Sequence, residues 1–272
     1  MWLNRRDDIE RWTRSWTGER FEDGRPRVPD DILRRMRLVT VEEAWGVLKG
    51  HGYRYQYAGD WLNVHPDRIL VGRAVTAAFV PTRPDLHEVI QEWGNGRGSV
   101  GLHNSFVIDT LVKDDVIVID MFGKVKDGTF AGDNLGTAIA NKTGTGMVIH
   151  GGIRDLLRVA EIPNIAIFAR GVDASAIADV AMSHLNAPVR IDQATVLPGD
   201  VVLGSVSGVI FIPPHLAQEV VERSELIRKQ DEWGQIRIRE DRYTSGQVDG
   251  NWTDEMRADF AAWHEQDKQR AS

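Results

Sequence analysis

Cysteine is absent from the 272 residues of this chain. Its absence excludes disulfide bridges, zinc sites built from thiolates, and cysteine nucleophiles. Any bound metal ion must therefore be held by oxygen or imidazole ligands. Where carboxylates dominate such a set, the favoured ions are Mg²⁺ and Mn²⁺.

Long apolar runs and clusters of positive charge are missing as well. No stretch reaches the roughly 20 consecutive apolar residues that a membrane helix needs. The start of the chain, MWLNRRDDIERW, lacks the apolar region of a secretory signal. The formal net charge is −7, and the Lys and Arg residues are scattered along the chain. We therefore expect a cytoplasmic protein that binds neither membranes nor nucleic acid.

Hydrophobic residues make up 42% of the chain, enough for one large domain with extensions at its ends. Apolar runs and turn signals predict strands at 69–80, 116–121, 165–169, 189–191, 195–197, 201–203 and 209–212. Helical spacing predicts a helix after Gly171 that ends near Leu185, and another from Pro214 to Lys229.

The stretch from Gly132 to Asp155 concentrates charged residues beside glycines. Its pattern of loop, helix, strand and loop would bring Asp133 and the Arg154–Asp155 pair to the same end of a sheet. Asp133 lies at a predicted helix N-terminus, where free backbone N–H groups attract anions. Arg154 offers a planar fork for carboxylate or enolate oxygens. Asp155 supplies a hard oxygen ligand for a divalent cation, so the stretch predicts a site for a metal ion and an anion.

A second interpretation of the same residues is purely structural. Asp133 would cap the helix and Arg154 would form an ion pair with it, an arrangement that is common at helix N-termini. Considered alone, the residue types leave both interpretations open.

Several motifs in a fixed order carry a resemblance to a known family. The pattern Asp-x20-Arg-Asp, with GDNL before the helix and GGIRD after the strand, resembles the RraA-like superfamily. That group contains the 4-hydroxy-4-methyl-2-oxoglutarate (4-carboxy-4-hydroxy-2-oxoadipate) aldolases and the regulator of ribonuclease E activity. Further matches are GRAVTA at 72–77, FARGV at 168–172, LPGDVVLG at 197–204 and SGVIFIP at 207–213. The resemblance covers roughly residues 35 to 225.

The resemblance implies an α/β fold, a three-layer β/β/α sandwich of the RraA-like type with extensions at both ends. It divides the chain into an N-terminal extension at 1–34, a catalytic domain at 35–228 and a C-terminal extension at 229–272. It also implies a homo-oligomer, a trimer or a hexamer, with sites at the subunit interfaces.

The activity implied by the resemblance is that of a metal-dependent class II aldolase or decarboxylase acting on a 2-oxo acid through an enolate. Asp155 would bind Mg²⁺ or Mn²⁺, largely through waters, and Asp133 would orient a metal-bound water. Arg154 would contact the keto and carboxylate oxygens of the substrate. The implied substrate-binding set is Gly132, Asn134, Leu135 and Arg154.

One segment departs from the aldolase pattern. After FARG the aldolases usually carry a Ser-Pro step and then a basic residue that meets the far carboxylate of the substrate. This chain reads VDASAIADVAMSHL, without a Lys. A neutral, hydroxylated tail is therefore an open possibility. Two further alternatives are a non-catalytic regulatory binding protein and other enolate chemistry such as sugar-acid dehydration. The presence of both aspartates and the arginine favours an enzyme.

Overall fold

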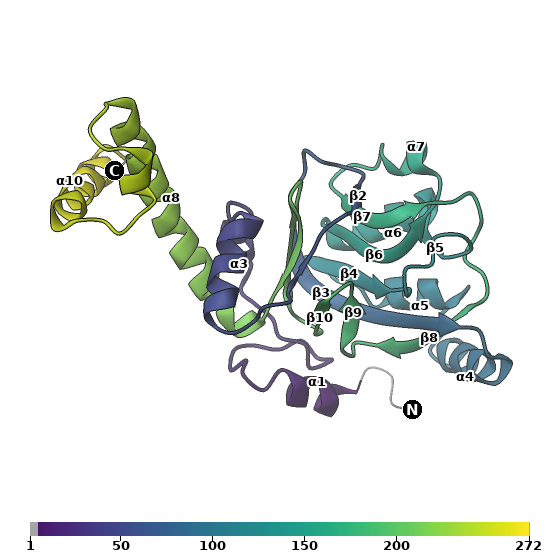
Figure 1. Ribbon diagram of the computed structural model, residues 1–272. Helices are drawn as coiled ribbons and strands as arrows, with labels where there is room; N and C mark the ends of the chain where they lie inside the picture. The colour runs from purple at the N-terminus through teal and green to yellow at the C-terminus, as the bar shows by residue number, and fades with distance from the viewer. Residues whose placement is uncertain (1–4, 272) are drawn as a thin grey trace. The chain divides into compact units, whose positions relative to one another are not determined.

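The computed structural model describes residues 5–271 (Figure 1). Two compact units divide the chain between Val220 and Val221. The helices of the first unit are α1 (Arg6–Trp12), α2 (Asp30–Met36), α3 (Val41–Gly50), α4 (Pro84–Asn95), α5 (His103–Asp109), α6 (Asp133–Thr143), α7 (Leu156–Val159) and the 3₁₀ helix η1 (Pro214–Leu216).

Twelve strands complete the described part of the first unit. They are β1 (Tyr57–Ala58), β2 (Leu62–Asn63), β3 (Leu70–Pro81), β4 (Asp115–Asp120), β5 (Thr129–Ala131), β6 (Gly146–Ile153), β7 (Ala166–Val172), β8 (Val180–Leu185), β9 (Val189–Ile191), β10 (Ala194–Val196), β11 (Val201–Ser205) and β12 (Gly208–Ile212).

A mixed ten-stranded sheet forms the centre of this unit. Its main order is β1-β12-β11-β3-β4-β6-β7-β2, while β5 pairs with β6 and β8 pairs with β3. The central strands β3, β4, β6 and β7 run parallel because helices connect them. Strands β9 and β10 form a separate two-stranded sheet.

Alternating side chains of the central strands give the unit three layers. On β4, Ile117 and Ile119 belong to a buried cluster that includes Ile90 of α4, Phe106 of α5 and Ile139 of α6. Val116 and Val118, which point to the opposite face, belong to a second cluster with residues of β9, β10 and β12. Helices therefore cover one face of the sheet and β-structure covers the other. The predicted α/β class with β/β/α layers is confirmed.

The helix predicted between Gly171 and Leu185 is wrong. Residues 180–185 form β8, which pairs antiparallel with β3 and places Val180 opposite Pro81. The repeated alanines of this segment imitate helical spacing, but Asp179 adopts a left-handed conformation (φ 55°) that ends any helix before β8. Pairing with a distant strand overrides the local pattern.

The segment before α2 belongs to the same compact unit as the sheet. Arg25 is buried, and its Nη1 donates to Asp115 Oδ1 at 2.8 Å, where Asp115 begins β4 and is fully buried. Asp23 accepts from Nε of the same guanidinium at 2.7 Å. This buried ion pair holds the segment before α2 against the start of β4. The extension boundaries at 34 and 229 remain predictions.

The second unit is a small helical assembly centred on Trp233. It contains the continuation of α8 (Ala217–Arg239), α9 (Ser245–Val248) and α10 (Asp254–Ala271). Trp233 is fully buried, lies 4.5 Å from the ring of Trp252, and donates from Nε1 to Asp259 at 3.0 Å. Phe260 of α10 packs on both tryptophan rings. Phe260 of α10 thus finds its aromatic partners within this unit.

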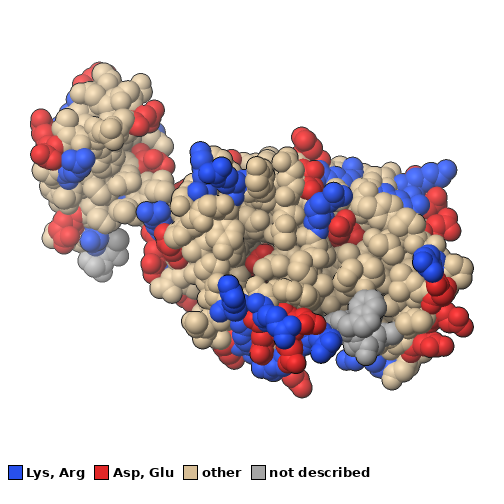
Figure 2. All heavy atoms as spheres, turned by 60° about the horizontal axis from the view of Figure 1, so that its bottom comes forward, with Lys and Arg blue, Asp and Glu red and all other residues tan. Residues whose placement is uncertain are grey.

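Charges of both signs alternate on the face drawn in Figure 2, where Lys and Arg lie among Asp and Glu. Within residues 5–271 no helix is long and apolar enough to span a bilayer. The absence of nucleic-acid binding and the cytoplasmic location remain predictions.

Candidate active site

Parallel pairing of β5 with β6 assembles the residues that the sequence singles out. Thr129 lies opposite Gly152, and Ala131 lies opposite Ile153. Both strands therefore end at the same edge of the sheet, where β5 is followed by Gly132 and β6 by Arg154. The backbone N–H of Arg154 donates to the carbonyl of Ala131 at 3.1 Å and closes the pairing.

Asp133 does not act as the cap that the structural interpretation predicts. Gly132 occupies the N-cap of α6, and Asp133 is the first helical residue. Its Oδ1 accepts from the N–H of the adjacent Asn134 at 2.8 Å. The ion pair of Arg154 is with Asp155 and not with Asp133. Among the described residues, the N–H of Leu135 has no hydrogen-bond acceptor, so one donor at the helix N-terminus remains available.

Arg154 keeps most of its guanidinium available. Its Nε lies 3.3 Å from Asp155 Oδ2, and both side chains are about two-fifths exposed. Within the described part of the chain, the two terminal nitrogens have no hydrogen-bond partner. These nitrogens form the planar fork that suits the oxygens of a carboxylate or an enolate.

Gly132 leaves the space in which the carboxylate of Asp155 lies. A Cβ on Gly132 would stand 2.3 Å from Asp155 Oδ2 and 3.0 Å from Arg154 Cγ. Asp155 itself adopts a left-handed conformation (φ 56°) at the N-cap of α7, where its carbonyl accepts from Arg158 and Val159. The backbone of Asp155 therefore anchors α7, and its side chain turns toward Gly132 and Arg154.

A cavity of about 190 Å³ lies at this edge of the sheet. Arg154, Gly132 and Asp133 contribute to its wall. Its lining also includes Asn104 and Ser105 of α5, which sequence reasoning missed. The sequence feature that could have identified them is their place shortly after the glycine-rich stretch WGNGRGSVG, which ends at Gly101. Asn104 Nδ2 donates to the carbonyl of Phe130 at 2.8 Å and ties α5 to β5.

His150 lies outside this lining although it precedes the glycine turn. Its Nδ1 is 3.5 Å from Oδ1 of Asp120, which ends β4. Burial raises the pKa of Asp120, but the interaction with His150 and a hydrogen bond from the N–H of Phe122 hold it below its ordinary value. His150 therefore faces Asp120 and not the cavity, although its buried Nδ1 makes no hydrogen bond of normal geometry within the described residues.

The model of one protein family, RraA-like (aldolase/RraA), matches residues 39–211, more than half of the chain. The chain belongs to the RraA-like family. The matched residues begin just before α3, end within β12, and include the whole cavity edge from Gly132 to Asp155.

Named relatives of this RraA-like chain cover parts of it. Protein DlpA of Legionella pneumophila is 31% identical over 166 residues, which are 60% of this chain and 24% of that protein. A putative 4-hydroxy-4-methyl-2-oxoglutarate aldolase of Halalkalibacterium halodurans is 32% identical over 119 residues, 43% of this chain and 55% of that protein. The chain thus spans about a quarter and about half of these two relatives.

Solved structures share the fold. Streptomyces coelicolor RraAS2, described as an unusual member of the RNase ES inhibitor RraA family, has a TM-score of 0.66 at 24% identity, covering 78% of this chain and 100% of that chain. An uncharacterized protein from Pseudomonas syringae has a TM-score of 0.65 at 23% identity, covering 82% of this chain and 98% of that chain. These two likenesses show the fold alone.

The donor set of the RraA-like site suits one kind of metal ion. Across residues 5–271 no group of three or more His, Asp or Glu side chains could hold a metal ion. Asp155 nevertheless presents a carboxylate over Gly132. Mg²⁺ and Mn²⁺ accept such a site, because they retain several waters and need only one or two protein carboxylates. An ion that requires a closed cage of protein ligands, such as structural Zn²⁺, does not fit.

Proposed function

We propose that this chain is a divalent-metal-dependent lyase that cleaves a 4-hydroxy-2-oxo acid to pyruvate, or decarboxylates oxaloacetate, through an enolate. The observation that carries the proposal is the largely unpaired guanidinium of Arg154 on the wall of a small cavity, beside the carboxylates of Asp133 and Asp155. Membership of the aldolase/RraA family and the name of the Halalkalibacterium relative support the reaction class.

The reaction breaks one carbon–carbon bond. In the aldol case the 4-hydroxyl loses its proton to a base, the C3–C4 bond breaks, and C4 leaves as a carbonyl compound. In oxaloacetate the same bond breaks and C4 leaves as CO₂. In both cases the electron pair of the bond passes into the enolate of pyruvate, and a proton added at C3 completes the product.

The residues of the cavity edge have separate roles in this proposal. Arg154 binds the keto and carboxylate oxygens and stabilises the negative charge that develops on the enolate oxygen. Asp133 holds or accepts the proton of the 4-hydroxyl, directly or through a water. The helix N-terminus at Gly132, Asn134 and Leu135 binds the carboxylate. In the present structure the N–H of Asn134 is occupied by Asp133, so Leu135 provides the free donor.

Asp155 would hold the divalent cation, together with waters and substrate oxygens. A cation bound there would supply Lewis-acid polarisation of the keto group. The carboxylate of Asp155 also contacts Nε of Arg154 and so orients the fork that binds the substrate.

Exposed apolar side chains around the site support the trimer or hexamer as part of the proposal. Leu102, in the cavity wall, is 50% exposed, and Leu157, two residues after Asp155, is 84% exposed. A second copy of the chain would cover such side chains and complete the cavity. Light scattering of the purified protein, expected to give three or six chains, tests this part.

Metal-dependent release of pyruvate is the result expected of the purified protein. It would be treated with a chelator, supplied again with Mg²⁺ or Mn²⁺, and assayed with oxaloacetate and with several 4-hydroxy-2-oxo acids. Turnover is expected only after the metal is restored. Absence of turnover for every substrate and both metals would contradict the proposal, and a search for a protein partner would then follow.

Replacing Gly132 with alanine is expected to lower kcat for pyruvate release by about 100-fold, because a displacement of about 1 Å at an active site has effects of that size. The new Cβ would force the carboxylate of Asp155 from its place, while the backbone at Gly132 (φ −118°) accepts alanine without strain. Gly46→Ala is the matched control, since its Cβ meets nothing within 4 Å. Equal kcat values for Gly132→Ala and the control would refute the role assigned to this contact.

A further inference from the structure

A second and larger cavity adjoins the first. Its volume is about 550 Å³, and its wall shares Leu102 and Ile177 with the 190 Å³ cavity at Arg154. The segment that departs from the aldolase pattern passes between the two cavities. Ala176 lines the smaller one, and Ala178 and Asp179 line the larger one. A substrate held at Arg154 and long enough to pass these residues would extend into the larger cavity.

A buried histidine in the wall carries an unused hydrogen-bond donor. His103 of α5 is 3% exposed, and its Nδ1 accepts from the N–H of Met182 at 3.1 Å. That bond fixes the neutral ring with its proton on Nε2. Burial, and then the neighbouring His87, lower the pKa of His103 to about 4, and the carbonyl of His87 offsets them only in part. Within the described residues, the buried Nε2 makes no hydrogen bond of normal geometry, although the carbonyl of His87 lies close enough to raise the pKa of the ring.

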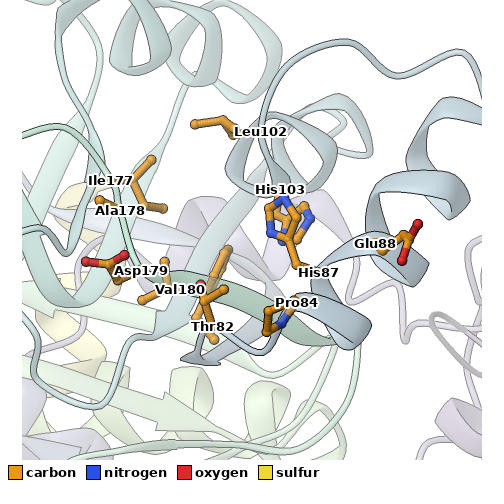
Figure 3. A pocket seen from close by; sticks show the side chains of 11 residues that line it. Thr82, Pro84, His87, Glu88, Leu102, His103, Ile177, Ala178, Asp179 and Val180 are labelled. Atoms are coloured by element: carbon orange, nitrogen blue, oxygen red, sulfur yellow. The ribbon is translucent and has the colours of Figure 1, made fainter.

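His87 of α4 pairs with this ring. The two ring centroids are 4.6 Å apart, with an interplanar angle of 33°. Figure 3 shows the two imidazoles side by side on one wall, with Asp179 and Ala178 across the cavity. The Nδ1 atom of His87 is also buried and has no partner in the described part of the chain. Two unsatisfied polar atoms from different helices at one cavity wall indicate a ligand that supplies their partners.

The remaining lining determines which kind of ligand fits. Asp179, Glu88 and Thr82 add polar groups to those of the two histidines, and the rest of the wall is largely apolar, including Phe79 and Val180. Among the described residues that line this cavity, none is Lys or Arg. A distal carboxylate would therefore lack a cationic partner, beside the carboxylate of Asp179. An ammonium group could not accept from His103 Nε2, because it has no acceptor. Hydroxyl groups both donate and accept hydrogen bonds, so they can pair with the imidazole donor and with the carboxylate acceptors of the wall.

We infer that the 550 Å³ cavity binds the neutral, hydroxylated tail of the substrate, which is then a sugar-derived 2-oxo acid. This inference rests on the proposed lyase function, which places the 2-oxo acid end at Arg154. His103 Nε2 donates to a tail hydroxyl, His87 contributes a second polar contact, and Asp179 accepts from hydroxyls across the cavity. The two histidines act by binding the tail and take no part in breaking the bond.

The test compares two substrates in the His87→Phe variant, which keeps an aromatic ring against His103 and removes both ring nitrogens. The substrates are oxaloacetate, which has no tail, and a six-carbon 2-oxo-3-deoxyaldonic acid, which carries three hydroxyls beyond C3. For the sugar acid, kcat/KM is expected to fall about tenfold, in line with the loss of hydrogen bonds. For oxaloacetate, kcat/KM is expected to stay within about twofold of the unmodified chain, because the tail contacts are not used.

The matched control is His184→Phe, the same change at an exposed imidazole on β8 that lines neither cavity. It is expected to leave both substrates unaffected. Three results would overturn the inference. In the first, the unmodified chain turns over oxaloacetate but not the sugar acid. In the second, it prefers a dicarboxylic substrate or one with an ammonium tail. In the third, His87→Phe lowers kcat/KM equally for both substrates.

Failure of the proposed function has a different signature, namely no turnover of either substrate by the unmodified chain. Calorimetric titration of the sugar acid then decides the inference alone. Binding that His87→Phe weakens about tenfold and His184→Phe leaves unchanged supports the hydroxyl-binding cavity. No binding, or binding that His87→Phe does not weaken, overturns it.

Discussion

Replacing Arg154 with alanine is expected to lower kcat for pyruvate release by about 10²- to 10³-fold, the loss usual when a donor to a developing oxyanion is removed. The effect arises because the terminal nitrogens of Arg154 have no partner in the described chain and are available for the enolate oxygen. Stability should change little, since the side chain is 43% exposed and, within residues 5–271, its only ion pair is with the adjacent Asp155.

Two further variants sharpen this prediction. Arg154→Lys keeps the charge but loses the planar fork, so its kcat should lie between those of alanine and arginine. Arg158→Ala, four residues along on α7, removes an arginine that is 74% exposed and whose ion pair in the described chain is with Glu161, and it should retain full activity. Equal impairment of Arg158→Ala and Arg154→Ala would mean that a general loss of positive charge explains both variants. The specific role assigned to Arg154 in stabilising the enolate would then be wrong.

Asp155→Asn is expected to weaken the binding of Mn²⁺ by at least about tenfold, a loss of the size seen when support around a metal site is removed. The amide keeps the shape of the side chain, and asparagine accepts the left-handed backbone of this position (φ 56°). The change therefore removes the charge and leaves the turn intact. Kcat at fixed metal concentration should fall with the affinity.

Mn²⁺ binding is measured directly by its effect on the relaxation of water protons, without any substrate. The control is Asp114→Asn, an aspartate of similar conformation (φ 63°) that follows α5 and lines neither cavity. Unchanged Mn²⁺ affinity in Asp155→Asn would remove Asp155 as the metal ligand. Weakened affinity in both variants would show that the measurement reports overall charge.

Local patterns were sufficient for the centre of the fold and for the expectation that Asp133 and Arg154 lie at one edge of the sheet. The apolar run at 116–121 and the glycine-bounded pattern from Gly132 to Asp155 predict strands and a helix that the structure contains as β4, α6 and β6. The parallel register of β5 and β6 then brings Asp133 and Arg154 to one edge. Several motifs in a fixed order therefore predicted the family, and the loop, helix and strand pattern predicted that Asp133 and Arg154 lie near each other.

Contacts between distant segments could not be predicted from the same patterns. The segment 180–185 becomes a strand because β3 pairs with it, against an alanine-rich pattern that favours a helix. His87 and His103 meet because α4 and α5 pack at one end of the sheet, and neither residue has a distinctive neighbourhood in the sequence. The cavity beside them depends on that packing, which periodicity does not encode.

The measurement that tests the central claim most directly is pyruvate release from oxaloacetate by the unmodified chain and by Arg154→Ala, each stripped of metal and then supplied with Mn²⁺. The account predicts turnover that appears in the unmodified chain only after Mn²⁺ is added and is about 10²- to 10³-fold lower in the variant. Equal rates in the two proteins at saturating Mn²⁺, or the same rate in the unmodified chain with and without the metal, would contradict it.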